Sequence, residues 1–275
     1  MIKILTLNWN GKDKLQRLYP TLLNAFDGLK WEWYIKDNGS KDESLLLERE
    51  WNNSQIHFVK CDHNNDNFAK GCNILYKESS SKEDDFILLL NNDVIFNDNV
   101  SVKNMTKIFN DKDVGLVGAK LLYSNTNNIQ HAGVIFDRKR ASLPCHFMAN
   151  KSNKEFDSKN REFQATTGAV WLTKSNIYEN ICRTNKSSYN GLDENFHWCF
   201  EDVSAGLSIK YDLNKKVVVC GSTNIFHEES ASLKKNPVNR LFLKHNVDYF
   251  LNKWQGRYIV DKDSYENNLK FNLYG

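Results

Sequence analysis

Short apolar runs alternate with helix-like stretches along the first half of this chain. Four β-rich runs bounded by polar residues predict strands at residues 2–7, 33–35, 56–59 and 86–90. Apolar residues recur at helical spacing between these runs, which predicts helices at residues 15–23, 44–51 and 68–76. Repeated strand–helix–strand units are typical of an α/β fold, in which helices flank a Rossmann-like, mostly parallel central sheet.

The pattern is less regular in the second half. Further β-rich runs predict strands at residues 114–118, 133–136, 166–172 and 217–220. Residues 138–163 are polar and weakly periodic, so we expect a long surface segment that closes over a bound ligand as a lid. Apolar residues near helical spacing predict a final helix within residues 238–254.

Composition narrows the class of protein. The chain has 275 residues, 40% hydrophobic and 26% charged, which suits one globular α/β domain. Its net charge of +3 gives no strong reason to expect nucleic acid as a partner. Six scattered cysteines predict free thiols in a reducing compartment. Because no apolar stretch approaches the ~20 residues of a membrane span and the N-terminus lacks a signal-peptide pattern, we expect a cytoplasmic protein.

Polar clusters flank the predicted strands of the first half. They are Asn8-Trp9-Asn10-Gly11, Asp37-Asn38-Gly39-Ser40, Asn67-Phe68-Ala69-Lys70-Gly71 and Asn91-Asn92-Asp93. Because ligands of open α/β sheets bind at the carboxyl ends of the strands, we expect these clusters to converge at one edge. An aromatic ring, a carboxylate that pairs with a base, a lysine and a metal-binding aspartate together suit a nucleoside diphosphate and a divalent cation.

Each candidate residue also has a purely structural interpretation. The Asp-Asn-Gly-Ser cluster favours a turn, and Trp9 alone suits packing. Glu201 and Asp202 suit the first turn of a helix, where acidic side chains are favourable. His227 after a strand suits an ordinary core or surface histidine. The order and spacing of the four clusters together favour the functional interpretation.

These motifs resemble those of the inverting nucleotide-sugar glycosyltransferases of family 2, which have the GT-A fold, and in particular a rhamnosyltransferase-like subgroup. The resemblance spans about residues 2–250. Beyond the four clusters, the matching motifs are Gln130-His131-Ala132-Gly133, Thr167-Gly168-Ala169, Glu201-Asp202-Val203 and Phe226-His227-Glu228-Glu229-Ser230-Ala231-Ser232. The resemblance implies one domain over residues 1–275, with a nucleotide-binding half (1–100), an acceptor-binding half (101–235) and a helical tail (236–275).

The resemblance implies donor-binding roles for residues of the first half. Asn8 and Trp9 would line the base pocket, and Asp37 would accept a hydrogen bond from the N3–H of uracil or thymine. Lys70 would lie near the diphosphate. The remaining donor-binding residues would be Asn91 and Asn92.

It also implies a metal site for Mn²⁺ or Mg²⁺. Asn91-Asn92-Asp93 matches the Asp-x-Asp motif of the family, but Asn91 replaces the first aspartate. Asp93 is therefore the one carboxylate ligand expected there, and His227 matches a histidine that completes the metal shell in many relatives. With one carboxylate lost, we expect tight metal binding to depend on the donor diphosphate.

The catalytic and acceptor-binding residues would come from the second half. Asp202 matches the general base of the family, and Glu201 would orient Asp202 or the acceptor. Thr167 and Gly168 would form the floor under the acceptor sugar. Trp198 would stack on a sugar face, although core packing explains Trp198 equally well.

The function expected from the resemblance is metal-dependent, inverting transfer of a sugar from a UDP- or dTDP-sugar to a hydroxyl. The acceptor would be a glycan, a lipid-linked sugar or a protein, in the synthesis of a surface polysaccharide, lipopolysaccharide or glycoprotein. Two alternatives stay open: a nucleotidyltransferase, and a non-catalytic homologue that binds a nucleotide sugar or glycan. Basic and apolar residues mix in the tail, which suits a packed helix or a peripheral contact with the inner membrane face.

Overall fold

One twisted sheet runs through the whole molecule. The computed structural model describes residues 1–275 apart from 61–65, 183–190, 198, 229–237, 269–270 and 275. From one edge to the other, the main strands are β10 (Arg161–Phe163), β12 (Lys216–His227), β6 (Val114–Leu122), β11 (Val170–Lys174), β4 (Phe86–Leu90), β1 (Ile2–Asn8), β2 (Trp31–Asp37) and β3 (Ile56–Val59). Two short strands extend it, β5 (Val94–Phe96) beside β12 and β7 (Ile129–His131) beside β6.

Strand direction changes near the middle of this sheet. Strands β3, β2, β1 and β4 are parallel neighbours, and β12 is parallel to β6. Strand β11 runs antiparallel to both β4 and β6 and joins the two parallel groups. The predicted α/β fold with a mostly parallel central sheet is therefore confirmed. The sheet contains strands from both the expected nucleotide-binding half (1–100) and the expected acceptor-binding half (101–235).

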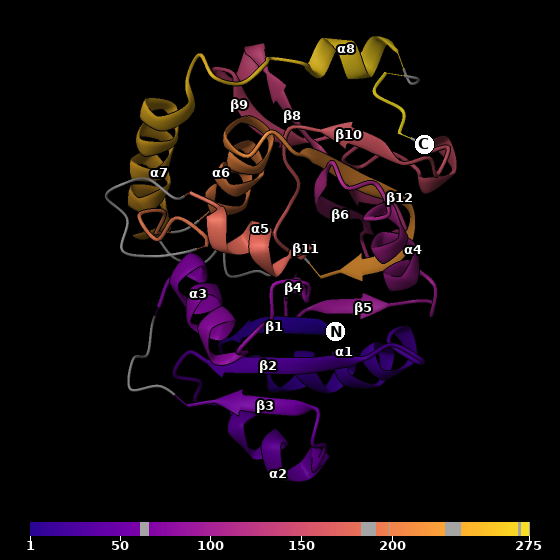
Figure 1. Cartoon of the computed structure of the whole chain (residues 1–275). Helices are drawn as coiled ribbons and strands as arrows, with labels where there is room; N and C mark the ends of the chain where they lie inside the picture. Colours follow the sequence, from indigo (N-terminus) through magenta and orange to yellow (C-terminus); the bar gives the residue numbers. More distant parts are fainter. Residues whose placement is uncertain (61–65, 183–190, 198, 229–237, 269–270, 275) are drawn as a thin grey trace.

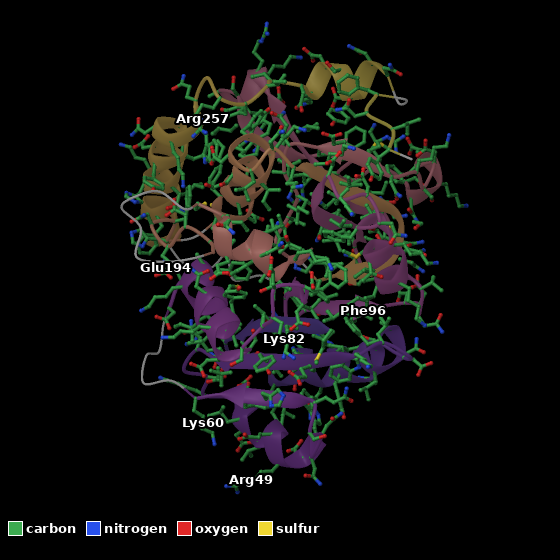
Figure 2. All side chains as sticks on the ribbon, viewed as in Figure 1. Arg49, Lys60, Lys82, Phe96, Glu194 and Arg257 are labelled. Carbon is green, nitrogen blue, oxygen red and sulfur yellow. The ribbon has the colours of Figure 1, made fainter. Side chains whose placement is uncertain are left out.

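Helices cover both faces of the sheet (Figure 1). They are α1 (Lys12–Ala25), α2 (Leu47–Trp51), α3 (Phe68–Glu78), α4 (Ser101–Ile108), α5 (Ser175–Asn180), α6 (Glu201–Leu207), α7 (Val238–Trp254) and α8 (Lys262–Asn267), with short helical turns η1 (Ser44–Leu46), η2 (Arg138–Arg140), η3 (Asn153–Glu155) and η4 (Ser208–Asp212). Helices α1 and α4 pack on one face, and α3, α5 and α6 pack on the other. Side chains fill the space between sheet and helices (Figure 2).

The alternation of side chains along each strand explains this layering. In β4, Leu88 and Leu90 face the core under α1 and α4, whereas Ile87 and Leu89 face the core under α3. Because successive strand residues point to opposite faces, a run that is apolar at every position is buried on both. Strand β4 is such a run, and its predicted bounds, residues 86–90, are the observed ones. Strands β2, β6 and β12, which also contain polar residues, extend beyond the predicted runs.

The predictions for the second half need two corrections. Residues 138–163 are not a long surface loop, because they include β10 and also β9 (Leu143–His146), which pairs with β8 (Val134–Asp137). Phe147, Phe156 and Phe163 of this segment are buried. Strand β9 gave a weak signal because its residues are only partly buried or exposed, so the position does not require an apolar run. The strand predicted at 166–172 begins only at Val170.

The C-terminal helix packs against the protein. Phe250 and Trp254 of α7 are fully buried beside Val203 and Leu207 of α6. Phe242 and Leu243 on the same helix are exposed. Among the described residues, no helix combines the length and the apolar character that crossing a bilayer requires. Contact of this tail with a membrane surface stays a prediction.

Candidate active site

The carboxyl ends of β1, β2 and β4 bring three of the predicted polar residues into hydrogen-bond contact. Asn8 ends β1, and its side-chain Nδ2 donates to Asp37 Oδ1 at the end of β2 over 3.1 Å. Asn92, just after β4, donates to Asn8 Oδ1 over 2.8 Å. The convergence follows from the parallel pairing of β1 with both neighbours. Asn8 is fully buried, and its hydrogen bonds to Asp37 and Asn92 hold these two residues near each other.

Asp37 lies in the turn that the sequence suggested. Its Oδ2 accepts hydrogen bonds from the backbone N–H groups of Gly39 and Ser40, at 3.2 and 2.8 Å. Trp9, which directly follows Asn8 at the end of β1, has an exposed fraction of 60%. The structure thus excludes core packing as the explanation of Trp9. A large aromatic ring left in solvent beside an oriented carboxylate is a surface suited to stacking.

Asp93 and His227 form the second part of the site. His227 ends β12, where the strand pairs antiparallel with β5, so that His227 lies opposite Val94. This register places the His227 Nε2 atom 3.2 Å from Asp93 Oδ1, although 133 intervening residues separate the two in sequence. Asn91 Nδ2 also lies 3.2 Å from His227 Nε2. The two residues expected as metal ligands, Asp93 and His227, therefore meet in space, together with Asn91.

The electrostatic surroundings keep Asp93 ionised. Burial acts to raise the pKa of Asp93, but the hydrogen bond and charge of His227, together with Lys14, hold this pKa below its usual value. Lys14 reaches across from α1, with its Nζ atom 3.3 Å from Asp93 Oδ2. A buried carboxylate that stays charged is well suited to a cation or to positively charged partners.

The Asp93–His227 pair fits a divalent metal ion. Two cis ligands of an octahedral cation with bonds near 2.1 Å lie about 3.0 Å apart, close to the spacing observed. In the described part of the chain, no group of three or more His, Cys, Asp or Glu side chains could hold a metal ion. The described residues thus offer two ligands, and the other positions would be filled by oxygen atoms of a ligand or water.

Asp202 lies in the first turn of α6. Its Oδ2 accepts a hydrogen bond from the Gly168 N–H over 2.8 Å, and its Oδ1 accepts from the Val203 N–H over 2.8 Å. Cys199 and Phe200, the two residues before α6, have left-handed φ values of 57° and 73°. Such strain in non-glycine residues clusters at functional sites, because surrounding structure must stabilise it.

The neighbouring acids Glu201 and Asp202 differ in their surroundings. Glu201 is buried, and its Oε2 atom has no hydrogen-bond partner among the described residues. Burial, followed by repulsion from Asp202, raises the pKa of Glu201 to about 8. Burial also raises the pKa of Asp202, but the N–H groups of Gly168 and Val203 counteract it. Of the two acids, Glu201 is therefore the one that burial holds in its neutral form near neutral pH.

A short stretch of backbone links Asp202 to the Asp93–His227 pair. Gly168 donates to Asp202, and the next residue, Ala169, accepts a hydrogen bond from the Asn91 N–H over 2.9 Å. A Cβ atom added to Gly168 would lie 3.2 Å from the Asp202 Cβ, so a side chain there would push Asp202 aside. Asn91 and Asp202 are thus fixed relative to each other.

The other predicted residues lie around this centre. Lys70 pairs with Asp66 over 2.7 Å. Thr167 donates its N–H to His131 Nε2 at 3.4 Å, next to Gly168. Trp198 lies outside the described residues. The donor and acceptor roles of these residues stay predictions.

Sequence reasoning missed Lys14 and gave no role to Gln130. Lys14 lies in the first turn of α1, just after the Asn8–Gly11 cluster, and its sequence position does not indicate a contact with the predicted metal site. Gln130 belongs to a motif that was noticed, and its side chain contacts His227 through two hydrogen bonds. Only the folded chain shows that both residues touch the Asp93–His227 pair.

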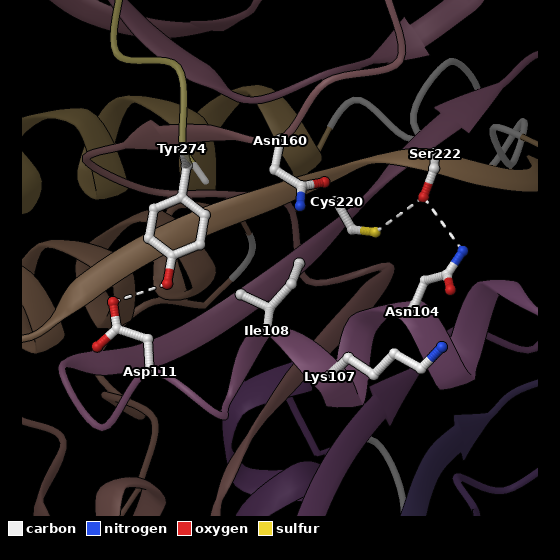
Figure 3. Close-up of a pocket in the computed structure, with 8 residues that line it drawn as sticks. All are labelled: Asn104, Lys107, Ile108, Asp111, Asn160, Cys220, Ser222 and Tyr274. Atoms are coloured by element: carbon white, nitrogen blue, oxygen red, sulfur yellow. Dashed lines mark hydrogen bonds between the residues drawn. The ribbon is translucent and has the colours of Figure 1, made fainter.

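Cavities of about 460, 850 and 430 Å³ lie away from this centre in the described part of the chain, and none of the three is lined by Asp93, Asp202 or His227. A cavity of about 460 Å³ lies between α4, β12 and the C-terminal segment, where Asn104 donates to Ser222 and Tyr274 donates to Asp111 (Figure 3). A cavity of about 850 Å³ lies beside the β8–β9 hairpin. Four polar residues of the first cavity therefore already bond in pairs.

Known proteins resemble this chain in sequence. The family model described as glycosyl transferase family 2 matches residues 4–181. The O-antigen biosynthesis protein RfbC of Myxococcus xanthus is 25% identical over 211 residues, covering 74% of this chain and 15% of that protein. An uncharacterised protein, y4gI, of Sinorhizobium fredii is 24% identical over 254 residues, covering 87% of this chain and 26% of that protein. The chain spans about a quarter or less of the curated relatives it matches.

Solved structures match its fold. GalNAc-T7, solved with UDP, GalNAc and Mn²⁺, has a TM-score of 0.68 at 13% identity, covering 93% of this chain and 48% of that one. The mannosyltransferase PcManGT of Pyrobaculum calidifontis, solved with GDP-Man and Mn²⁺, has a TM-score of 0.58 at 12% identity, covering 91% and 63%. These likenesses confirm the GT-A fold. Because the family model covers more than half of its length, the chain belongs to glycosyl transferase family 2.

Proposed function

We propose that this chain is a metal-dependent, inverting glycosyltransferase that moves a sugar from a UDP- or dTDP-sugar to a hydroxyl group. The observation that carries the proposal is the pairing of Asp93 with His227 at 3.2 Å, held beside a separate carboxylate, Asp202, through Gly168 and Asn91. A cation-binding pair beside an isolated base is what displacement of a nucleoside diphosphate by a hydroxyl requires.

The donor would lie across the carboxyl ends of β1, β2 and β4. Trp9 offers an exposed ring on which the base stacks, and Asp37 presents a carboxylate that the Asn8 amide orients. A carboxylate at this position accepts from the N3–H of uracil or thymine, which is the reason for preferring UDP or dTDP. GalNAc-T7 was solved with UDP and PcManGT with GDP-Man, so relatives of this fold use more than one base.

The diphosphate would meet Asp93, His227 and Lys14. A Mn²⁺ or Mg²⁺ ion held by Asp93 and His227 would offset the charge that develops on the departing diphosphate. Both GalNAc-T7 and PcManGT were solved with Mn²⁺. Because Asn91 brings no charge, the phosphate oxygens would supply ligands that a second carboxylate supplies elsewhere.

Asp202 would act as the base. As the acceptor oxygen bonds to the anomeric carbon, the bond from that carbon to the diphosphate breaks and the hydroxyl proton passes to an Asp202 oxygen. Attack opposite the leaving group inverts the anomeric configuration. A neutral Glu201 supports this role, because a second charge beside Asp202 would otherwise compete for the proton.

The acceptor would approach over Thr167 and Gly168. Similarity to an O-antigen biosynthesis protein favours a growing surface glycan or its lipid-linked precursor as the acceptor. Exposed Phe242 and Leu243 on α7 would provide a weak contact with the membrane that holds such a precursor. Co-sedimentation with anionic liposomes tests that contact, and a Phe242→Ser variant that sediments equally well would contradict it.

The reaction is tested with purified chain, Mn²⁺ and a panel of nucleotide sugars, by measuring release of the nucleoside diphosphate with and without acceptor glycans. We expect release from a UDP- or dTDP-sugar, its loss in excess EDTA, and its loss in Asp202→Asn. Production of pyrophosphate would identify a nucleotidyltransferase instead. Nucleotide-sugar binding without any turnover across the panel would favour the non-catalytic homologue.

A further inference from the structure

Gln130 makes two hydrogen bonds to the same residue, His227. The Gln130 Nε2 atom donates to the His227 carbonyl oxygen over 3.2 Å, and the Gln130 Oε1 atom lies 2.7 Å from His227 Nδ1. Gln130 has an exposed fraction of 3%, so water does not compete for these contacts. Because both ends of its buried amide contact the same residue, Gln130 can fix the orientation and the tautomer of His227.

The orientation of the Gln130 amide determines which His227 nitrogen carries the proton. A carbonyl oxygen only accepts hydrogen bonds, so the amide NH₂ must face the His227 carbonyl and Oε1 must face Nδ1. An amide oxygen also only accepts, so Nδ1 must donate to it. In neutral imidazole the other nitrogen then has a free lone pair. In neutral His227, Nε2 is therefore the nitrogen that is left free to bind a cation, and it can accept from Asn91 Nδ2 at 3.2 Å. In charged His227, Nε2 instead donates its proton to Asp93 Oδ1 at 3.2 Å, and this proton would leave when a cation binds.

A β-bulge places Gln130 in this position. Along the antiparallel β6–β7 pair, Leu121 lies opposite His131, but Leu122 lies opposite Ile129. Gln130 is thus the extra residue that no β6 residue opposes. Bulges re-aim a side chain and are frequent near active sites. Since β6 residues 121 and 122 also pair with β12, β7 and β12 lie on opposite sides of β6, and the Gln130 side chain reaches across that strand to His227.

We infer that Gln130 is a positioning residue that holds His227 as the Nδ1–H tautomer and aims its Nε2 lone pair at the metal position beside Asp93. This inference rests on the proposed metal site. A metal-ligating histidine commonly donates its other N–H to an oxygen acceptor, and loss of such an acceptor costs about 10- to 100-fold in metal affinity. Gln130 would supply that acceptor here with an amide instead of a carboxylate.

The test measures metal binding and the tautomer, without turnover. Mn²⁺ affinity is measured at saturating UDP by electron paramagnetic resonance for the wild type and for Gln130→Leu. Gln164→Leu is the matched control, because Gln164 is also buried and bonds Asp261 and Ile259, away from His227. We expect Gln130→Leu to weaken Mn²⁺ binding about 10- to 100-fold and Gln164→Leu to leave it unchanged.

The tautomer is read from long-range ¹H–¹⁵N correlations of the metal-free protein, with the His227 signals assigned by their loss in His227→Asn. With His227 neutral, the wild type should show a protonated Nδ1 and a bare Nε2, and this pattern should be lost in Gln130→Leu. Wild-type affinity in Gln130→Leu, or a protonated Nε2 in neutral wild-type His227, would overturn the inference while the metal site survives. Unchanged Mn²⁺ binding in both Asp93→Asn and His227→Asn would overturn the metal site and the inference together.

Discussion

Replacing Glu201 with glutamine should change how the stability of this protein depends on pH. Glu201 is buried, its Oε2 atom lacks a hydrogen-bond partner among the described residues, and its pKa rises to about 8. In the unfolded chain the same carboxyl returns to its ordinary pKa of about 4.3. Between these two values the folded protein keeps a proton that the unfolded chain releases.

The sign and the size of the effect follow from this difference. Because the folded state binds more protons, the free energy of unfolding falls as pH rises through this window and stays lower above it. At about 1.4 kcal/mol for each pKa unit, the full loss is at most about 5 kcal/mol. A glutamine stays neutral throughout, although its amide hydrogens bring an unmet donor cost of about 1–3 kcal/mol at every pH. The slope with pH is therefore the diagnostic quantity.

Urea unfolding of the wild type and Glu201→Gln near pH 5 and near pH 8 measures this slope. We expect the wild type to lose at least about 2 kcal/mol more than Glu201→Gln between the two pH values. Glu50→Gln, which changes an exposed residue, controls for the loss of a charge and should behave as the wild type. Equal slopes for the wild type and Glu201→Gln would refute the claim that Glu201 is held neutral in the fold.

Three further predictions concern the candidate site. Asp202→Asn should lower kcat by about 10²–10⁴-fold and leave UDP affinity unchanged, as steady-state rates and calorimetry would reveal. Gly168→Ala would place a Cβ 3.2 Å from the Asp202 Cβ and should lower kcat about 10-fold or more, with little change in the melting temperature. Gly11→Ala would place a Cβ 2.3 Å from Asn92 Nδ2 and 2.4 Å from Asn8 Oδ1, so the Kd for UDP should rise about 10-fold.

Much of the first half could be predicted from the sequence. Strand β4 at the centre of the sheet is apolar on both faces, so its signal depends on few other residues. The polar clusters at the strand ends follow directly, because parallel strands end at the same edge. The weaker predictions lie in the second half, where the residues of β9 are only partly buried or exposed and β11 begins four residues later than expected.

The sequence by itself determined the family, the parallel strands and the residue types of the site. Only the tertiary structure decided which of these residues touch. The β5–β12 pairing brings His227 to Asp93, the bulge in β7 turns Gln130 towards His227, and burial separates the roles of Glu201 and Asp202. The physical reason is that register and burial depend on the whole sheet, whereas strand and turn preferences are local.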